Sequence, residues 1–287
     1  MRTLMAGLAL SGLFLFGGCV RTIAVSTVGG IVDDGFGAFT EESDLAFVEQ
    51  ALPANLKLLE VMLRSDPSNT RLLRLASEGY SSYALAYLED SEPVRAREFY
   101  RRGKDFALRI LREDRELARG LDGSLDDLKA ALEARGKANV PALFWAAFGW
   151  GSEITLNLTS PDAIGDLPKT DAIMEYVARQ DSLYYYGGAD VFLGTLYGSR
   201  PRMLGGDPVK ARAHFERALR LNRGEFLMTY VYYARSVAVQ TQNEGLFDEL
   251  LTKVLQASPD LLPAARLANQ VAKKKASSLL NRKQDLF

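Results

Sequence analysis

The stretch LGTLYGSRPRMLGGDPVKARAHFERALRL, residues 193–221, decides the fold. It contains the pattern L-G-x-x-Y, which begins at Leu193, and the pattern A-x-x-x-F-x-x-A, which begins at Ala211. A small residue such as Gly194 lets two helix axes approach closely, and a large ring such as Phe215 fills the space between them. The stretch therefore predicts two antiparallel helices packed as a hairpin.

Both patterns are typical of a tetratricopeptide (TPR) repeat. The alternative is an unrelated helical hairpin, because A-x-x-x-F-x-x-A also describes many amphipathic helices. Degenerate versions of the patterns recur, so we expect four hairpins between a leading and a capping helix. The expected elements are a leading helix over Glu42–Arg64 with a break or kink at Pro53, hairpins near Tyr80–Gly103, Trp145–Arg179, Asp190–Ala218 and Tyr230–Ala257, and a capping helix from Leu262 to about Leu280.

The predicted fold is thus all-α: an irregular TPR-like helical hairpin array, or α-solenoid, with a capping C-terminal helix that covers the last apolar face. The helical domain is predicted over residues 42–287. The long helix that follows Pro93 is expected to run to about Arg119. An insert near residues 120–140 contains a short helix that begins at Ser124. This helix is either a partner-facing element or a helix packed over one end of the array.

Long loops between the two helices of a hairpin line up on a common edge of such an array. The loop that precedes the turn at Asp207 and Pro208 is one of them, and Asp207 is expected to cap the next helix. We therefore predict a partner-facing loop that includes Arg200, Pro201 and Arg202.

Residues 1–18 have the features of a lipoprotein signal peptide. An apolar run from Leu4 to Phe16, preceded by one arginine, ends in two glycines directly before Cys19. This pattern resembles a bacterial lipobox, in which the cysteine thiol is lipidated and becomes the mature N-terminus. An ordinary signal peptide with an incidental cysteine is the alternative. Residues 19–41 are then a tether. Val20 rather than Asp follows the cysteine, and the resemblance to such lipoproteins therefore implies retention at the outer membrane, facing the periplasm.

The composition excludes several classes of function. The chain has 287 residues, 47% of them hydrophobic, and a formal net charge of −1. This near-neutral balance argues against nucleic-acid binding, and the run Lys273–Lys275 is interpreted as a solvated helix face. One cysteine and one histidine cannot form a His/Cys zinc site.

The sequence shows no arrangement typical of catalysis. His214 is the only histidine, and we interpret it as a solvated or packing residue of a helix. No glycine-rich phosphate loop is present, and we expect no cofactor and no enzyme activity. An all-α glycosidase or phosphatase remains as the enzymatic alternative.

Aromatic residues cluster in three places, and some of them occupy no repeat position. Core packing between hairpins is the simplest interpretation of aromatics at helical spacing. The sharper hypothesis is a pore within the array that holds a hydrophobic small molecule. On this hypothesis the lining residues are Phe144, Trp145, Phe148, Trp150, Tyr184, Tyr185, Phe192, Tyr230, Tyr232 and Tyr233.

The lipobox, the irregular TPR-like hairpins and above all residues 198–219 together resemble the T component of tripartite ATP-independent periplasmic (TRAP) transporters. The resemblance implies a periplasmic lipoprotein, lipidated at Cys19, that forms a homotrimer with a pore through each subunit. It also implies binding to the extracytoplasmic solute receptor of a TRAP system and help in delivering an apolar ligand. The alternative is a generic TPR scaffold lipoprotein for envelope protein assembly. A scaffold predicts repeated Asn and Lys/Arg at inner positions, which the sequence does not show.

Overall fold

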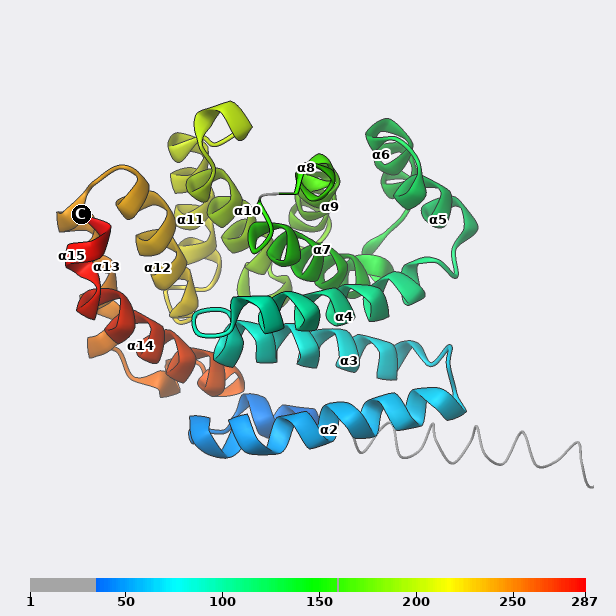
Figure 1. The fold of residues 1–287 in the computed structure, drawn as a ribbon, viewed down its shortest axis with the longest axis horizontal. Coiled ribbons are helices and arrows are strands. Elements are labelled where there is room, and N and C mark those ends of the chain that lie inside the picture. The colour runs from blue at the N-terminus through cyan, green and yellow to red at the C-terminus, as the bar shows by residue number, and fades with distance from the viewer. Residues whose placement is uncertain (1–34, 159) are drawn as a thin grey trace, which may run out of the picture.

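The computed structural model describes residues 35–287 apart from residue 159, and within them it contains helices and connecting turns but no strand (Figure 1). The predicted all-α array is therefore confirmed. The signal peptide, Cys19 and residues 20–34 of the tether lie outside the described residues. The helices are α2 (Leu45–Ser65), α3 (Thr70–Tyr83), α4 (Pro93–Leu111), α5 (Arg115–Asp122), α6 (Leu125–Glu133), α7 (Val140–Thr155), α8 (Pro161–Gly165), α9 (Leu167–Gln180), α10 (Gly188–Ser199), α11 (Pro208–Leu221), α12 (Met228–Tyr233), α13 (Glu244–Gln256), α14 (Arg266–Asn281) and α15 (Lys283–Leu286).

The helices begin where side chains cap them. The carboxylate of Asp207 accepts hydrogen bonds from the first backbone N–H groups of α11, and Pro208 is the first residue of that helix, as predicted. Ser124 and Asp127 form a capping box at the start of α6, which also begins where the sequence predicts.

One expected break and one expected helix end are absent. Of the break or kink expected at Pro53, the break is absent, because α2 continues through Pro53. The helix after Pro93 ends at Leu111 instead of Arg119, because Asp114 caps a separate helix, α5, by accepting hydrogen bonds from two of its backbone N–H groups. Local capping thus overrides the longer periodic pattern.

The hairpin formed by α10 and α11 packs as its sequence predicts. Phe215 is fully buried, and a Cβ atom placed on Gly194 would lie 2.9 Å from its ring. Ala211 and Ala218, the small positions of the second pattern, are also fully buried. Equivalent pairs are α3 with α4, α7 with α9 and α12 with α13.

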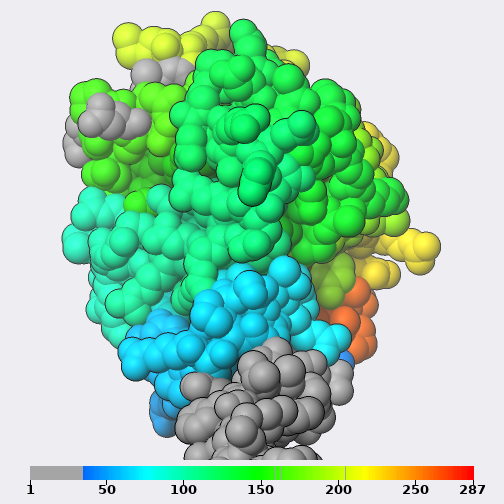
Figure 2. Space-filling view, turned by 90° about the vertical axis from the view of Figure 1, so that its right-hand side faces the viewer, coloured from blue at the N-terminus to red at the C-terminus, as the bar shows by residue number. Residues whose placement is uncertain are grey.

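The insert forms a hairpin of its own from α5 and α6. It lies at the end of the molecule that faces the viewer in Figure 2. Leu128 and Leu132 of α6 are buried, and α6 packs against α9. The insert helix is therefore packed over one end of the array.

The array curves until its last long helix meets its first ones (Figure 1). Helix α14 packs against α2, and the guanidinium of Arg266 donates a hydrogen bond of 2.7 Å to the backbone carbonyl of Glu41. Lys275 of α14, which the sequence assigned to a solvated helix face, is instead buried and forms ion pairs with Glu89 and Asp90, which follow α3. These contacts close the array around an interior space. None of the described helices is both long and apolar enough to cross a bilayer.

A candidate ligand cavity inside the array

A cavity of about 1070 Å³ lies inside the closed array. Its wall is built from α3, α4, α7, α10, α12 and α14, together with the turns between them. Small-molecule sites usually enclose roughly 300–1,000 Å³ and are lined mainly by apolar and aromatic side chains. The cavity is therefore large enough for an elongated apolar molecule.

Seven of the ten aromatic residues named from the sequence line this cavity. Their rings pack against one another: Phe144 stacks on Phe148 at 5.9 Å between centroids, and Trp145 meets Tyr185 edge to face at 4.9 Å. Such ring pairs hold the wall in one shape, because aromatic pairs have preferred geometries. The seven are Phe144, Trp145, Phe148, Tyr184, Tyr185, Phe192 and Tyr232.

The other three aromatics lie outside the cavity wall. Trp150 lies on α7 with the ammonium of Lys104 5.8 Å from its ring centroid. Tyr233 stacks on Phe215 at 5.0 Å and is part of the core between hairpins. The hydroxyl of Tyr230 lies beside Gly224. The sequence assigned these three to the lining, and the structure gives them packing positions.

The N-terminal segment contributes cavity residues that the sequence reasoning missed. Residues 35–40, which were assigned to the tether, are helical, and Phe36 and Phe39 line the cavity. The Phe36 ring lies 3.2 Å from where a Cβ atom of Gly79 would stand. Periodicity could not show this contact, because the segment is too short for a helical pattern to be recognised.

The three consecutive tyrosines of the wall have an unusual backbone. Tyr185 and Tyr186 have φ angles of 47° and 60°, and Gly187 follows at 80°. The left-handed region costs a residue with a side chain about 1–2 kcal/mol. Strain of this kind persists where the surrounding structure enforces it, often at ligand sites. The rings of Tyr184 and Tyr185 lie against Phe144, at centroid distances of 5.2 and 5.5 Å.

One part of the cavity wall is charged. The Glu89 carboxylate accepts hydrogen bonds from Tyr100 at 2.6 Å, and from Tyr232, Arg235 and Lys275 at 3.1 Å each. Burial raises the pKa of Tyr100 and of Tyr232 well above its usual value, with the nearby Glu89 charge adding to the shift. Both hydroxyls therefore stay protonated and donate to the carboxylate.

Asp90 lies beside the same cations. Burial alone would raise the pKa of Asp90, but the charges of Lys275, Arg235 and Arg282 outweigh it, and the net shift is downward. Burial likewise opposes the charge of Arg235, and Glu89 more than compensates, so that the pKa of Arg235 is raised. Both side chains are therefore charged near neutral pH.

The predicted partner-facing loop is only partly available to a partner. Arg200 is buried, and its guanidinium donates two hydrogen bonds of 3.0 Å to the carboxylate of Asp171. Its backbone carbonyl accepts a hydrogen bond from Gln240 at 2.6 Å. Arg200 thus anchors the loop to the body, whereas Pro201 and Arg202 are exposed.

The single histidine is engaged in packing. His214 Nδ1 lies 2.8 Å from the buried carboxylate of Asp190, and its ring stacks on Tyr197 at 5.7 Å. This arrangement matches the packing role expected from the sequence. Within residues 35–287, apart from the undescribed position 159, no group of three or more His, Cys, Asp or Glu side chains could hold a metal ion.

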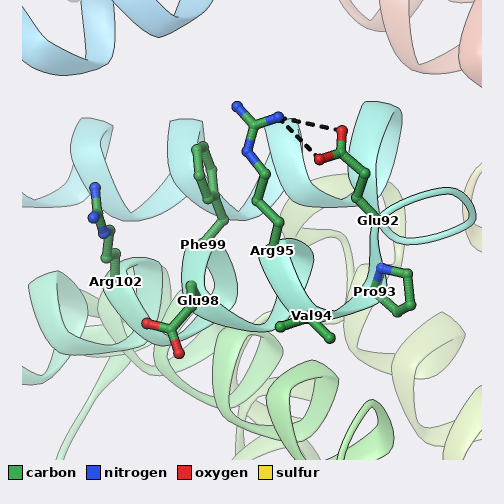
Figure 3. Close-up of a pocket in the computed structure, with 7 residues that line it drawn as sticks. All are labelled: Glu92, Pro93, Val94, Arg95, Glu98, Phe99 and Arg102. Carbon is green, nitrogen blue, oxygen red and sulfur yellow. Dashed lines mark hydrogen bonds and ion pairs between the residues drawn. The ribbon is translucent and has the colours of Figure 1, made fainter.

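A second, open groove of about 530 Å³ lies on the outer side of α4 (Figure 3). Arg95, Phe99 and Arg102 point the same way in that view, and both guanidinium carbons lie within 5.9 Å of the Phe99 ring centroid. Arg95 is also paired with Glu92 at 3.2 Å. Surface ion pairs of this kind contribute only about 0–1 kcal/mol, and the groove is too open to enclose a small molecule.

The fold and the cavity define a class of protein: a closed array of helical hairpins with an aromatic-lined interior. The family model of the TRAP transporter T-component matches residues 41–287. The chain therefore belongs to the TRAP transporter T-component family, and it is an accessory component of that kind of transporter. It is also similar to an uncharacterized protein of Treponema pallidum (strain Nichols), with 25% identity over 268 residues that cover 87% of this chain and 82% of the relative.

Proposed function

We propose that this protein is a non-catalytic transport accessory that holds a hydrophobic small molecule in its internal cavity and exchanges it with a TRAP-type solute receptor. The observation that carries the proposal is the cavity of about 1070 Å³, lined by seven clustered aromatics, in a chain of the T-component family. An interior of this size is unusual, because helical cores normally pack at the density of organic crystals.

The wall supports binding by burial of apolar surface. Each square ångström of apolar surface removed from water is worth about 25 cal/mol. The rings of Phe144, Phe148 and Phe192 contact one another, but Phe144 and Phe192 are already buried and only Phe148 is half-buried, so most of the surface removed from water would be the ligand's own. The tyrosine hydroxyls of the wall add a few polar contacts.

The proposed place of action is the periplasmic face of the outer membrane. Its support is the sequence around Cys19, whose acyl chains would anchor the protein to the bilayer. Homotrimeric assembly and docking of the solute receptor are supported by membership of the family. The exposed residues Pro201 and Arg202 are the proposed contact of the loop with the receptor.

Two measurements test this proposal. Native mass spectrometry of the protein purified without detergent should show an added mass, which denaturation releases as an apolar small molecule. A TRAP-type solute receptor encoded beside the protein should bind it in a pull-down, and Arg202→Glu should weaken that binding. If the receptor binds while no apolar molecule co-purifies or can be loaded, the protein is a docking platform and the ligand part of the proposal is wrong.

A further inference from the structure

The charged part of the cavity wall contains an arginine whose guanidinium donates hydrogen bonds through only one of its three nitrogens. Arg235 lines the cavity, and its side chain keeps 42% of its surface accessible. Its Nη1 group donates to Glu89 at 3.1 Å and to Asp90 at 3.2 Å. The Nε and Nη2 groups have no acceptor among the residues that the structure describes. These two groups form the edge of the guanidinium that binds a carboxylate through two parallel hydrogen bonds.

The acceptors around Arg235 are already occupied. Glu89 takes four hydrogen bonds, from Tyr100, Tyr232, Arg235 and Lys275. A cationic or hydroxyl-donating ligand would have to displace one of these donors. An anionic group would instead meet the Nε and Nη2 groups of Arg235, which donate to no described residue and belong to a side chain that remains partly exposed.

The charges of the cluster favour one further negative group. The carboxylates are those of Glu89 and Asp90, and the cations that act on them are Arg235, Lys275 and Arg282. The cluster therefore carries one more positive than negative charge, which a single carboxylate would balance. The other arginine of the cavity wall, Arg74, is ion-paired with Glu78 one turn along its own helix.

The backbone on both sides of this contact is irregular. Glu89 directly follows the π-helical turn Ala84–Leu88, and Arg235 lies within the π-helical turn Ala234–Ala238. π-Helical turns are rare and occur frequently at functional sites. The two turns bring together side chains that are 146 residues apart in the sequence.

We infer that Arg235 is the head-group site of the cavity, and that the natural ligand is an amphiphile with one carboxylate and a long apolar body. The Nε–Nη2 edge holds the carboxylate, while the aromatic wall formed by Phe144, Phe148 and Phe192 covers the apolar part. This inference rests on the proposed function, because it specifies the ligand of the same cavity.

The test compares two ligands that differ only in the head group. The full-length protein with Cys19→Ala, which removes the predicted lipidation site, is loaded with the neutral fluorophore 1-aminoanthracene. Dodecanoic acid and 1-dodecanol then compete for the cavity at pH 7.5. We expect the acid to bind at least about 10-fold more tightly than the alcohol, since hydrogen bonds between charged groups are the strong ones.

Two variants assign the preference to Arg235. Arg235→Gln should weaken the acid about 10-fold or more and change the alcohol less than 3-fold, so that retained alcohol binding shows an intact cavity. Arg235→Lys keeps the charge but lacks the two-donor edge, and should recover only part of the preference. Arg102→Gln, an arginine outside the cavity, is the matched control and should behave as the parent protein.

The outcomes separate the two proposals. Equal binding of acid and alcohol by the parent protein, or an acid preference that survives in Arg235→Gln, overturns the head-group site and leaves the apolar cavity intact. If neither ligand displaces the fluorophore and the fluorophore itself does not saturate, the proposed function fails together with this inference.

Discussion

The contact that closes the array can be tested by removing Glu89. Its side chain is 11% exposed and accepts hydrogen bonds from two tyrosines and two cations that belong to α4, α12, the π-helical turn Ala234–Ala238 and α14. Glu89→Ala leaves Arg235 and Lys275 with only Asp90 as a counter-charge. Removing one partner of a buried ion pair costs about 3–5 kcal/mol. Because Asp90 remains, we expect the lower end, a loss of about 3 kcal/mol in the free energy of unfolding.

Urea unfolding at pH 7, followed by far-UV circular dichroism, measures this loss. The matched control is Glu98→Ala on α4, whose ion pair with Arg101 has both side chains 47% exposed. We expect the control to lose less than about 1 kcal/mol, as exposed pairs do. If Glu89→Ala loses no more than Glu98→Ala, the ion cluster does not hold the array closed and the reasoning is refuted.

Two further predictions concern packing and pH. Gly194→Ala should lower the free energy of unfolding by about 1–3 kcal/mol, because the new methyl group would lie 2.9 Å from the fully buried Phe215 ring. Gly136→Ala is the control, since no atom lies within 4 Å of its new methyl group, and it should be neutral in the same urea titration. Asp90 has a folded-state pKa below its ordinary value of 3.8, so its stabilising effect is present above that pH and is lost as the pH falls through the lowered pKa. Asp90→Asn should therefore be less stable than the wild type at pH 7, and the difference should close as the pH falls below 3.8. A difference that stays constant as the pH falls contradicts the pairing with Lys275.

The local elements of the fold were predictable from the sequence for a physical reason. The patterns that begin at Leu193 and Ala211 describe contacts within one hairpin, where spacing alone decides which side chains meet. Gly194 and Phe215 do meet, and Asp207 does cap α11. Capping and hairpin packing are short-range effects that one sequence displays directly.

The closure of the array was not predictable in this way. The contact between Glu89 and Arg235 joins residues 146 positions apart, and no periodicity connects them. Both π-helical turns also escape a pattern search that assumes 3.6 residues per turn. Long-range pairing therefore had to come from the structure.

The aromatic character of the candidate site was predictable from the sequence, but the set of residues that line it was not. Helix α7 is apolar on nearly every side, so its hydrophobic pattern could not separate Phe148, which lines the cavity, from Trp150, which does not. Tyr233 of α12 occupies a core position because its ring stacks on Phe215 of α11, in the preceding hairpin. Phe36 could not be predicted as a cavity residue, because a short helix next to a tether shows no repeat pattern.

The most direct test of the central claim is to fill the cavity and measure binding of an apolar probe. Ala86 lines the cavity, and Ala54 is exposed on the outer side of α2. In a fluorescence titration with 1-aminoanthracene, the wild type and Ala54→Trp should saturate at one site, and Ala86→Trp should bind at least about 10-fold more weakly, because the indole would occupy the ligand's space. Absence of saturable binding by the wild type, or equal binding by Ala86→Trp in a folded state, would contradict the account.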